Sequence, residues 1–336
     1  MLKSLQKAFK VKEVRERLLY TFMMLVVIRI GCCLPIPGVD PSYLHDFFSN
    51  LQSSGMGFFN AITGGSFSSM SIFALSITPY ITSSIIMQLL TIAIPKLEEM
   101  QKDGEDGRKK IAEYTRYLTV GLALFESCAM AVGLGGKGLL LEDHRNIWGY
   151  LTVVAAMTAG SALLMWIGER ITDNGVGNGI SIVLLINIVS GTPQDMMTLY
   201  ERFMAGRSVA VATVSGIIVL AIIVAIVVFV LVLNDAERRI PVQYSKKMQG
   251  RRMIGGQSTY IPLKVNTANV IPVIFASSIM SMPVMIAQFF HVDYSTIGGK
   301  ILLALSSSNW FKPEAPAYSI GMLVYIVLVV LFAYFY

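Results

Sequence analysis

The side chains that could perform acid–base, nucleophilic or metal chemistry are few in this sequence and lie far apart. Glu126 is the only carboxylate well inside a long apolar run, and His45, His144 and His291 all fall between such runs. The sequence contains no His-Glu-x-x-His helix that would bind zinc, and no phosphate-binding loop. It also offers no nucleophile paired with a base, which covalent catalysis requires. We therefore expect a protein that is not an enzyme and that needs no cofactor or metal ion.

Ionisable residues inside the apolar runs are equally scarce. Acids in such positions usually face an interior or a water-filled cavity, and we expect this of Glu126. Arg29 lies near the outer third of the first run, where its side chain can extend towards the membrane interface. A proton-coupled secondary transporter would need more such groups, which speaks against that class. Its broken helices also carry proline and glycine, however, so a transporter remains an alternative. An intramembrane protease and an insertase are further alternatives.

Glycine and cysteine residues suggest close packing instead of chemistry. The segment ERITDNGVGNGIS has three glycines at alternate positions, but a dinucleotide-binding fingerprint would also need a preceding strand and a βαβ unit. We expect a tight turn here that lets two helices approach closely.

The three cysteines, Cys32, Cys33 and Cys128, lie in or beside apolar runs. This placement is typical of reduced, packed thiols and not of disulfides.

The elements that must position these residues are membrane helices. Hydrophobic residues make up 54% of the 336-residue chain and charged residues only 14%, against about 25% charged in soluble domains. A helix needs about 20 apolar residues to cross a bilayer. The sequence predicts an all-α, polytopic membrane helix bundle with a retained first span. Its eight predicted spans are residues 18–35, 68–94, 117–134, 148–167, 179–191, 209–233, 268–290 and 317–336.

The distribution of lysine and arginine predicts the orientation of the bundle. Of the 27 such residues, 20 lie in the N-terminal tail and in the loops after the second, fourth and sixth spans. Basic loops stay in the cytoplasm. We therefore expect the N-terminus and these three loops to be cytoplasmic.

Two of the predicted spans are unusually polar for lipid. In ITPYITSSIIMQLL, Ile77 and Ile81 share a helix face, and Pro79 between them is expected to kink or loosen the helix. Proline and paired serines also interrupt NTANVIPVIFASSIMSMPVMIAQF. The hydroxyls could simply bond their own helix and its neighbours. We favour helices that contact water at some times and another helix at others, as two walls of something that opens.

Two cytoplasmic loops are rich in charge. In PKLEEMQKDGEDGRKKIAEYTRY the central KDGEDG predicts a turn between two short helical arms. In the loop of about residues 235–267, IPVQYS predicts a short strand and QGRRMIGG a projecting tip. The three basic pairs of this loop could serve only to fix topology and contact anionic headgroups, or they could dock a large anionic partner. These pairs are Arg238 and Arg239, Lys246 and Lys247, and Arg251 and Arg252.

Several runs together resemble the SecY family, the large subunit of the bacterial Sec protein translocon. They are RIGCCLPIPGVD, SIFALSITPYITSSIIMQLL, EDGRKKIAEYTRYLT, LMWIGERITDNGVGNGISI and QGRRMIGGQSTYIPLKVNTANVIPVIFASSI. The resemblance covers nearly the whole chain. It implies a ten-helix protein-conducting channel with an hourglass pore, closed by a short plug helix and opening sideways between two halves. These halves would be residues 1–191 and 192–336, and we expect two further helices after Tyr336.

The resemblance also implies roles for particular residues. The pore ring falls on Ile77, Ile81, Ile180, Leu184 and Ile274, with Leu184 where isoleucine is common in relatives. The plug falls on about residues 56–70, including Phe58, Phe59, Asn60, Gly64, Gly65 and Ser66. The lateral gate separates spans two and seven from spans three and eight, with polar residues Thr82, Gln88, Glu126, Asn266, Asn269 and Ser278. Arg251 and Arg252 fall at the tip of the partner-docking loop.

The partners implied by the resemblance explain how such a channel is driven. They are the SecE and SecG subunits, the SecA motor, the ribosome with its RNA at the basic loop, chains that bear signal sequences, and membrane lipids. The implied location is the inner, cytoplasmic membrane of the cell, with multiple spans. A translocon fragment captured as a substrate or assembly intermediate is a further alternative.

Overall fold

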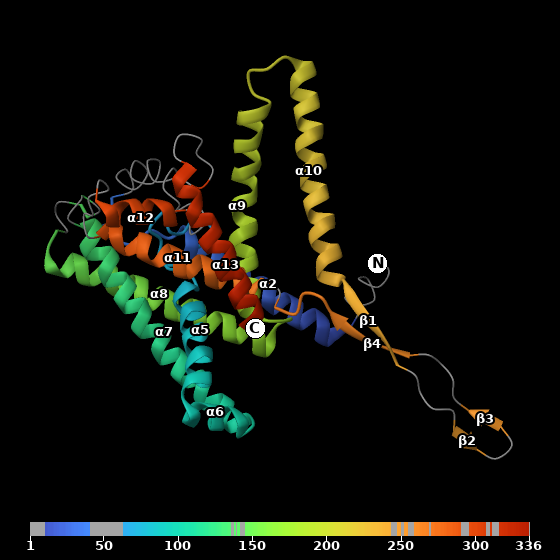
Figure 1. The fold of residues 1–336 in the computed structure, drawn as a ribbon. Coiled ribbons are helices and arrows are strands. Elements are labelled where there is room, and N and C mark those ends of the chain that lie inside the picture. The colour runs from blue at the N-terminus through green and yellow to red at the C-terminus, as the bar shows by residue number, and fades with distance from the viewer. Residues whose placement is uncertain are drawn as a thin grey trace. The chain divides into compact units, whose positions relative to one another are not determined.

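In the computed structural model the chain folds into two compact units, and Figure 1 labels their helices and strands. The first unit comprises Met1–Pro193 with Phe275–Val327, and the second comprises Gln194–Ile274 with Leu328–Tyr336. Within them, the structure describes residues 11–40, 63–135, 138, 140–141, 145–242, 247–249, 252–254, 259–268, 270–289, 296–306, 310 and 316–335.

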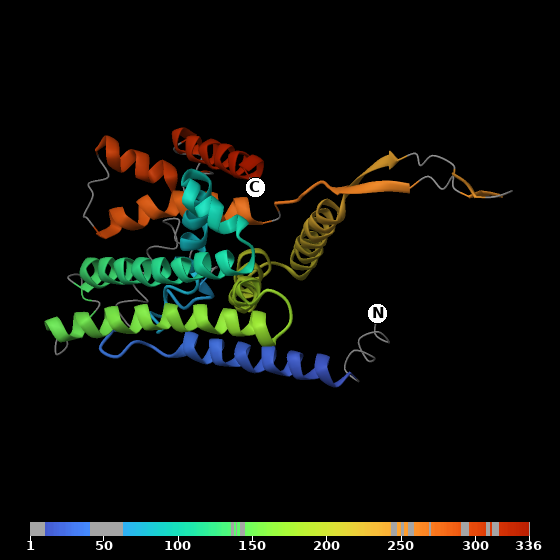
Figure 2. The ribbon, with the colours of Figure 1, turned by 90° about the horizontal axis from the view of Figure 1, so that it is seen from below.

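The first unit is built on three long helices. Helix α8 (Ile147–Asn174) packs against α7 (Glu105–Leu134) on one side and α2 (Lys12–Cys33) on the other, as Figure 2 shows. Helix α5 (Thr78–Ala93) also packs on α7. The unit further contains α6 (Pro95–Lys102), the first part of α9 (Gly179–Phe203), most of α11 (Ile271–Phe289), α12 (Ile297–Leu305), η4 (Pro316–Ser319) and the beginning of α13 (Ile320–Phe335).

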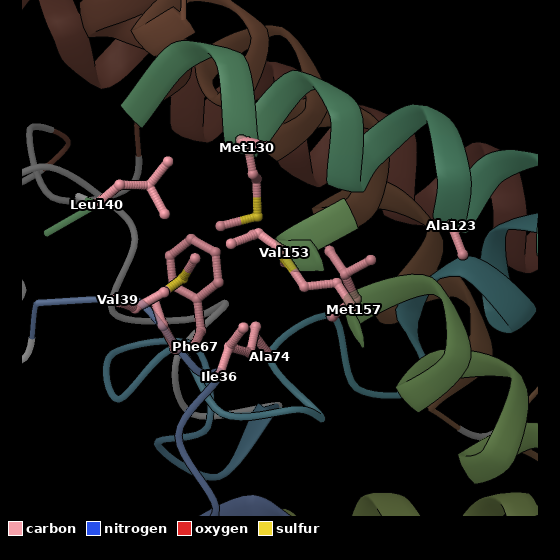
Figure 3. Close-up of a cluster of buried hydrophobic side chains, with 12 residues drawn as sticks. Ile36, Val39, Phe67, Ala74, Ala123, Met130, Leu140, Val153 and Met157 are labelled. Atoms are coloured by element: carbon pink, nitrogen blue, oxygen red, sulfur yellow. The ribbon is translucent and has the colours of Figure 1, made fainter. Parts of the chain in front are cut away.

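A buried apolar core joins α7 and α8 to the chain that precedes α5. Phe67 is 2% exposed and faces Met130 of α7, with Val153 and Met157 of α8 in the same cluster (Figure 3). Residues in such close-packed positions lose both hydrophobic burial and dispersion contacts when truncated. The core therefore fixes the position of residues 63–77, which carry Phe67.

Residues 64–70 and 72–77 form turns, and Ser71 between them forms a β-bridge with Pro35, so the helical part of the predicted span 68–94 begins only at Thr78. Met70 and Ser76 have φ angles of 41° and 52°, which a continuing right-handed helix cannot contain. The prediction that Pro79 kinks the helix is wrong. Pro79 lies in the first turn of α5, where a helix needs no N–H donor and proline starts it favourably.

The other predicted spans each coincide with a helix, but their number is not confirmed. Among the described residues, four helices are long and apolar enough to cross a membrane: α8, α9, α10 and Pro316–Phe335. Helices α5 and α6 count as a fifth span if they are taken as one segment, with a bend of 102° between them. The short predicted span 179–191 extends into its C-terminal flank, because α9 continues to Phe203.

The second unit contains the end of α9, helix α10 (Val209–Asp235) and a β-hairpin (Figure 1). Every residue of α10 is exposed or half-buried although nearly all are apolar, as expected for a helix surrounded by lipid. The hairpin follows directly: β1 (Glu237–Val242) pairs antiparallel with β4 (Thr259–Lys264), and β2 (Lys247–Gln249) with β3 (Arg252–Ile254). The strand predicted around IPVQYS is thus present as β1.

Candidate functional site

Four of the five predicted ring residues lie in one apolar cluster. Ile77, at the start of α5, is fully buried, and Ile81, one turn later, is half-buried against the same cluster. Ile180 and Leu184 of α9 pack there too, together with side chains of α2 and α8: Ile28, Leu164, Ile167 and Ile171. The fifth residue, Ile274, is half-buried in α11 and belongs to the second unit. The structure therefore brings together the ring residues of α5 and α9.

Two glycines let α8 and α9 approach closely enough to form this cluster. A Cβ atom at Gly168 would lie 3.1 Å from Ile180 Cδ1 and 3.7 Å from Ile77 Cδ1. A Cβ atom at Gly179 would collide with the carbonyl oxygen of Gly168. The turn between the helices is the close approach that the sequence predicts at Gly175, Gly177 and Gly179.

Side-chain bonds fix the beginning of α9 beside this turn. Asn178 Oδ1 accepts hydrogen bonds from the backbone N–H groups of Ile180 and Ser181, at 3.0 and 3.4 Å. Thr172 Oγ1 accepts another from the N–H of Gly179 at 2.9 Å. These acceptors satisfy N–H groups that have no partner inside the helix. The position of Ile180 is therefore set by the local cap as well as by packing.

The predicted plug region reaches α9 at its C-terminal part. Phe58, Phe59 and Asn60 lie outside the described residues. Gly64 and Gly65 have φ angles of +65° and +81°, and Ser66 is buried. The space for a Cβ atom at Gly64 is occupied, because the carbonyl oxygen of Asn187 would lie at 2.8 Å. Only glycine fits this approach without strain.

Buried and half-buried polar residues, whose contacts sequence reasoning missed, connect Ser76 to α8 and α9 and connect α9 to α2. Asn187 Nδ2 donates to Ser76 Oγ at 2.9 Å, and Ser161 Oγ of α8 donates to the carbonyl oxygen of Ser76 at 3.3 Å. Arg29 of α2, predicted to extend towards the interface, donates instead to Ser190 Oγ at 2.9 Å. Asn187 is the single asparagine within the apolar run ISIVLLINIV, and this was the available signal in the sequence. A buried side-chain amide needs a hydrogen-bond partner, so its position indicates a buried polar contact.

The predicted gate residues are only partly brought together. Thr82 and Gln88 lie on α5 and Glu126 on α7, two helices that pack on each other. Glu126 is 8% exposed, and its Oε2 atom has no hydrogen-bond partner among the described residues. Ser278 is half-buried on α11, next to Ser277, whose hydroxyl lies 3.3 Å from Tyr325 OH of α13. Asn266 belongs to the second unit, and Asn269 lies outside the described residues.

The basic residues of the hairpin divide between its shaft and its tip. The guanidinium carbon of Arg239 lies 4.7 Å from the ring centre of Tyr260, a cation–π contact that holds this side chain against the ribbon. Arg238, its neighbour on β1, and Arg239 are both exposed. Lys247 and Arg252 belong to β2 and β3, whereas Lys246 and Arg251 lie outside the described residues. The shaft thus leaves both arginines accessible to a partner, with Arg239 lying over Tyr260.

One ion pair connects α7 and α8 beside the ring. Arg116 Nε lies 2.7 Å from Glu169 Oε1, and this hydrogen bond raises the pKa of the Arg116 guanidinium. Both side chains are partly exposed, so the pair adds little stability. The ion pair joins α7 to α8 at Glu169, the residue that follows Gly168.

The described residues define an integral membrane protein of many α-helices, with an apolar cluster in its first unit and a basic hairpin in its second. The family model for SecY matches residues 71–336. The chain belongs to the SecY family of protein translocase subunits. Members of this family are subunits of a protein-translocation channel and not enzymes, which sets aside the transporter and protease alternatives.

Several relatives and solved structures are similar to this chain. The protein translocase subunits SecY of Streptomyces scabiei and Halalkalibacterium halodurans are 44% and 40% identical, and each alignment covers the whole chain and 76% of the relative. A solved protein-conducting channel has a TM-score of 0.59 at 19% identity, over 94% of this chain and 71% of that one. Sec61 in a canine ribosome–channel complex has a TM-score of 0.57 at 20% identity, covering 95% and 71%. The fold is therefore that of these channels.

Proposed function

We propose that polypeptides cross the membrane through a constriction formed by Ile77, Ile81, Ile180 and Leu184, completed by Ile274. The observation that carries this proposal is the convergence of the first four side chains on one cluster between α5, α8 and α9. An apolar constriction closes by dewetting and excludes ions. It can also surround a passing chain of any sequence without binding it, because it offers no hydrogen bonds or charges.

Hydrophobic segments would leave sideways, between α5 with α11 and α7 with α13. Thr82, Gln88, Glu126 and Ser278 are the described polar residues that we place along this path. Polar contacts between membrane helices are weak, of about 0.6 kcal/mol on average in one measured case. A contact of that strength can open and close, so a segment that prefers lipid can leave while a hydrophilic chain continues across.

The energy for transport would come from partners on the cytoplasmic side. We place the N-terminus and the hairpin there because most lysine and arginine residues lie on that side. The hairpin's arginine pairs suit the phosphates of ribosomal RNA, and the canine relative was solved in a ribosome–channel complex. The SecA motor would use the same hairpin, and SecE and SecG would complete the channel in the inner membrane. The plug, about residues 56–70, would seal the resting pore.

Transport by the assembled complex tests this proposal. The full-length protein, reconstituted into vesicles with its partner subunits and motor, should protect a secretory precursor from added protease. Replacing Ile81 and Leu184 together with aspartate should make the resting vesicles leak ions, because a charged ring stays wet. A precursor that remains fully digestible in the intact system would contradict the proposal.

A further inference from the structure

Helix α9 carries polar residues directly beyond its two ring residues. Asn187 follows Leu184 by three positions and Ile180 by seven, so all three lie on one face of the helix. Asn187 is fully buried, and its Nδ2 atom lies 2.9 Å from Ser76 Oγ, which is also buried. Ser76 immediately precedes the ring residue Ile77. The two ring-bearing elements are therefore joined by a hydrogen bond next to the ring.

A second contact joins the same part of α9 to the beginning of the turn segment, residues 63–77. Ser190 Oγ donates to the carbonyl oxygen of Asn187 at 2.6 Å and accepts from Arg29 Nη1 at 2.9 Å. A Cβ atom at Gly64 would lie 2.9 Å from Ser190 Oγ as well as 2.8 Å from the Asn187 carbonyl oxygen. The Ser76 end of the turn segment thus rests on Asn187, and the Gly64 end rests on Asn187 and Ser190.

These contacts hold the turn segment in a conformation that it would not keep alone. Ser76 has a φ of 52°, in the left-handed region that costs energy for a residue with a side chain. Its hydroxyl and its carbonyl oxygen are each bound by another helix, through Asn187 and Ser161. Asn187 Oδ1 has no partner among the described residues, so the bond from Nδ2 to Ser76 Oγ is the one that the structure describes for this side-chain amide. Loss of either partner leaves a buried polar group unsatisfied.

We infer that Asn187 and Ser190 are positioning residues that tie the turn segment to α9, so that ring widening and release of the segment occur together. Movement of α9 away from α5 displaces Ile180 and Leu184 from Ile77. The same movement breaks the Asn187–Ser76 bond and moves Asn187 and Ser190 away from Gly64. This inference rests on the proposed channel function, in which the segment 56–70 seals the resting pore.

Ion flux through the resting channel tests the inference. The full-length protein, assembled with its partner subunits in vesicles, is compared with the variants Asn187→Leu, Ser76→Ala and Ser190→Ala. Each should raise the resting leak by roughly 3- to 10-fold, the change expected for one buried hydrogen bond. Thr198→Val is the control, because the described hydrogen bond of this exposed hydroxyl lies within α9, to Gln194 O. It should leave the leak unchanged.

Two further readouts separate positioning from general damage. The exchanged pair Ser76→Asn with Asn187→Ser should return the leak towards the original value, since asparagine tolerates the left-handed region. Once an arrested polypeptide holds the channel open, all variants and the original protein should conduct equally. A leak unchanged in Asn187→Leu and Ser190→Ala, in channels that still transport precursor, would overturn the inference and leave the channel function standing. A lack of transport in the original protein would instead overturn the proposed function.

Discussion

The side chains of Ile77 and Ile180 meet at Gly168, their Cδ1 atoms lying 3.7 and 3.1 Å from the place of a Cβ atom there. These residues are 103 positions apart in the sequence, Ile77 immediately before α5 and Ile180 in α9, yet a third helix, α8, brings them together. The absence of a side chain at Gly168 is what makes this possible. Substitution there should act directly on the proposed ring.

Gly168→Leu should separate Ile77 from Ile180 and destabilise the protein. Inserting a large side chain into a packed site costs about 1–3 kcal/mol, and thermal unfolding in detergent should show it as a lower Tm. The resting ion leak of reconstituted channels should rise as well. Gly121→Leu on α7 is the matched control, because a Cβ atom at Gly121 has no neighbour within 4 Å. Equal effects of the two substitutions would contradict the role of Gly168.

Gly179→Ala should be more harmful than its small size suggests. Its Cβ atom would collide with the backbone carbonyl of Gly168, which cannot rotate away as a side chain can. We expect a loss of at least about 2 kcal/mol in the free energy of unfolding, measured by chemical denaturation. Gly298→Ala in α12, where a Cβ atom meets open space, should be neutral or slightly stabilising. An unaffected Gly179→Ala protein would show that α8 and α9 do not approach so closely.

Reversing the charge of the hairpin tip should weaken its binding to ribosomes. Arg251→Glu with Arg252→Glu removes phosphate contacts, so affinity should fall at least about tenfold and depend less on salt. Co-sedimentation of the reconstituted protein with ribosomes at several salt concentrations measures both effects. Arg202→Glu with Arg207→Glu, an equal charge change on the opposite predicted side, should bind as before. Unchanged binding of the tip variant would leave these arginines only a role in topology.

Weakening the contact between α11 and α13 should ease lateral release of hydrophobic segments. Ser277→Ala removes the hydroxyl that lies 3.3 Å from Tyr325 OH. The contact is worth about 0.6 kcal/mol if it resembles measured cases, so stability should change little. Membrane integration of a marginally hydrophobic test segment should increase by about 2- to 3-fold in this variant. The substitution Thr213→Val on α10 should leave integration unchanged. No difference between the two variants would contradict a gate at this position.

The helices were predictable from the sequence because lipid leaves a spanning segment little alternative. Unpaired backbone groups are costly in hydrocarbon, so an apolar run such as residues 209–233 must be helical, and α10 is. The KDGEDG turn between α6 and α7 and the close approach at Gly179 also follow from local residue types. Each of these features depends on neighbours in the sequence.

The turn segment was not predictable in the same way, because distant residues hold it. Its φ angles at Met70 and Ser76 are unfavourable alone. They are kept by bonds such as Ile36 N to Met70 O at 3.1 Å, and by Asn187, which lies 111 positions after Ser76. Apolar periodicity does not report such pairs, so residues 68–77 read as helix.

Crosslinking from the ring to a polypeptide in transit tests the central claim most directly. A single cysteine is placed at Ile77 or Ile274 of the full-length protein, and a secretory chain with one cysteine is arrested during transport. We expect crosslinks from both positions, and none from Ile217, an exposed residue of α10 that is 63% accessible. Crosslinks that form elsewhere in the protein but at neither ring position would contradict a pore through this ring.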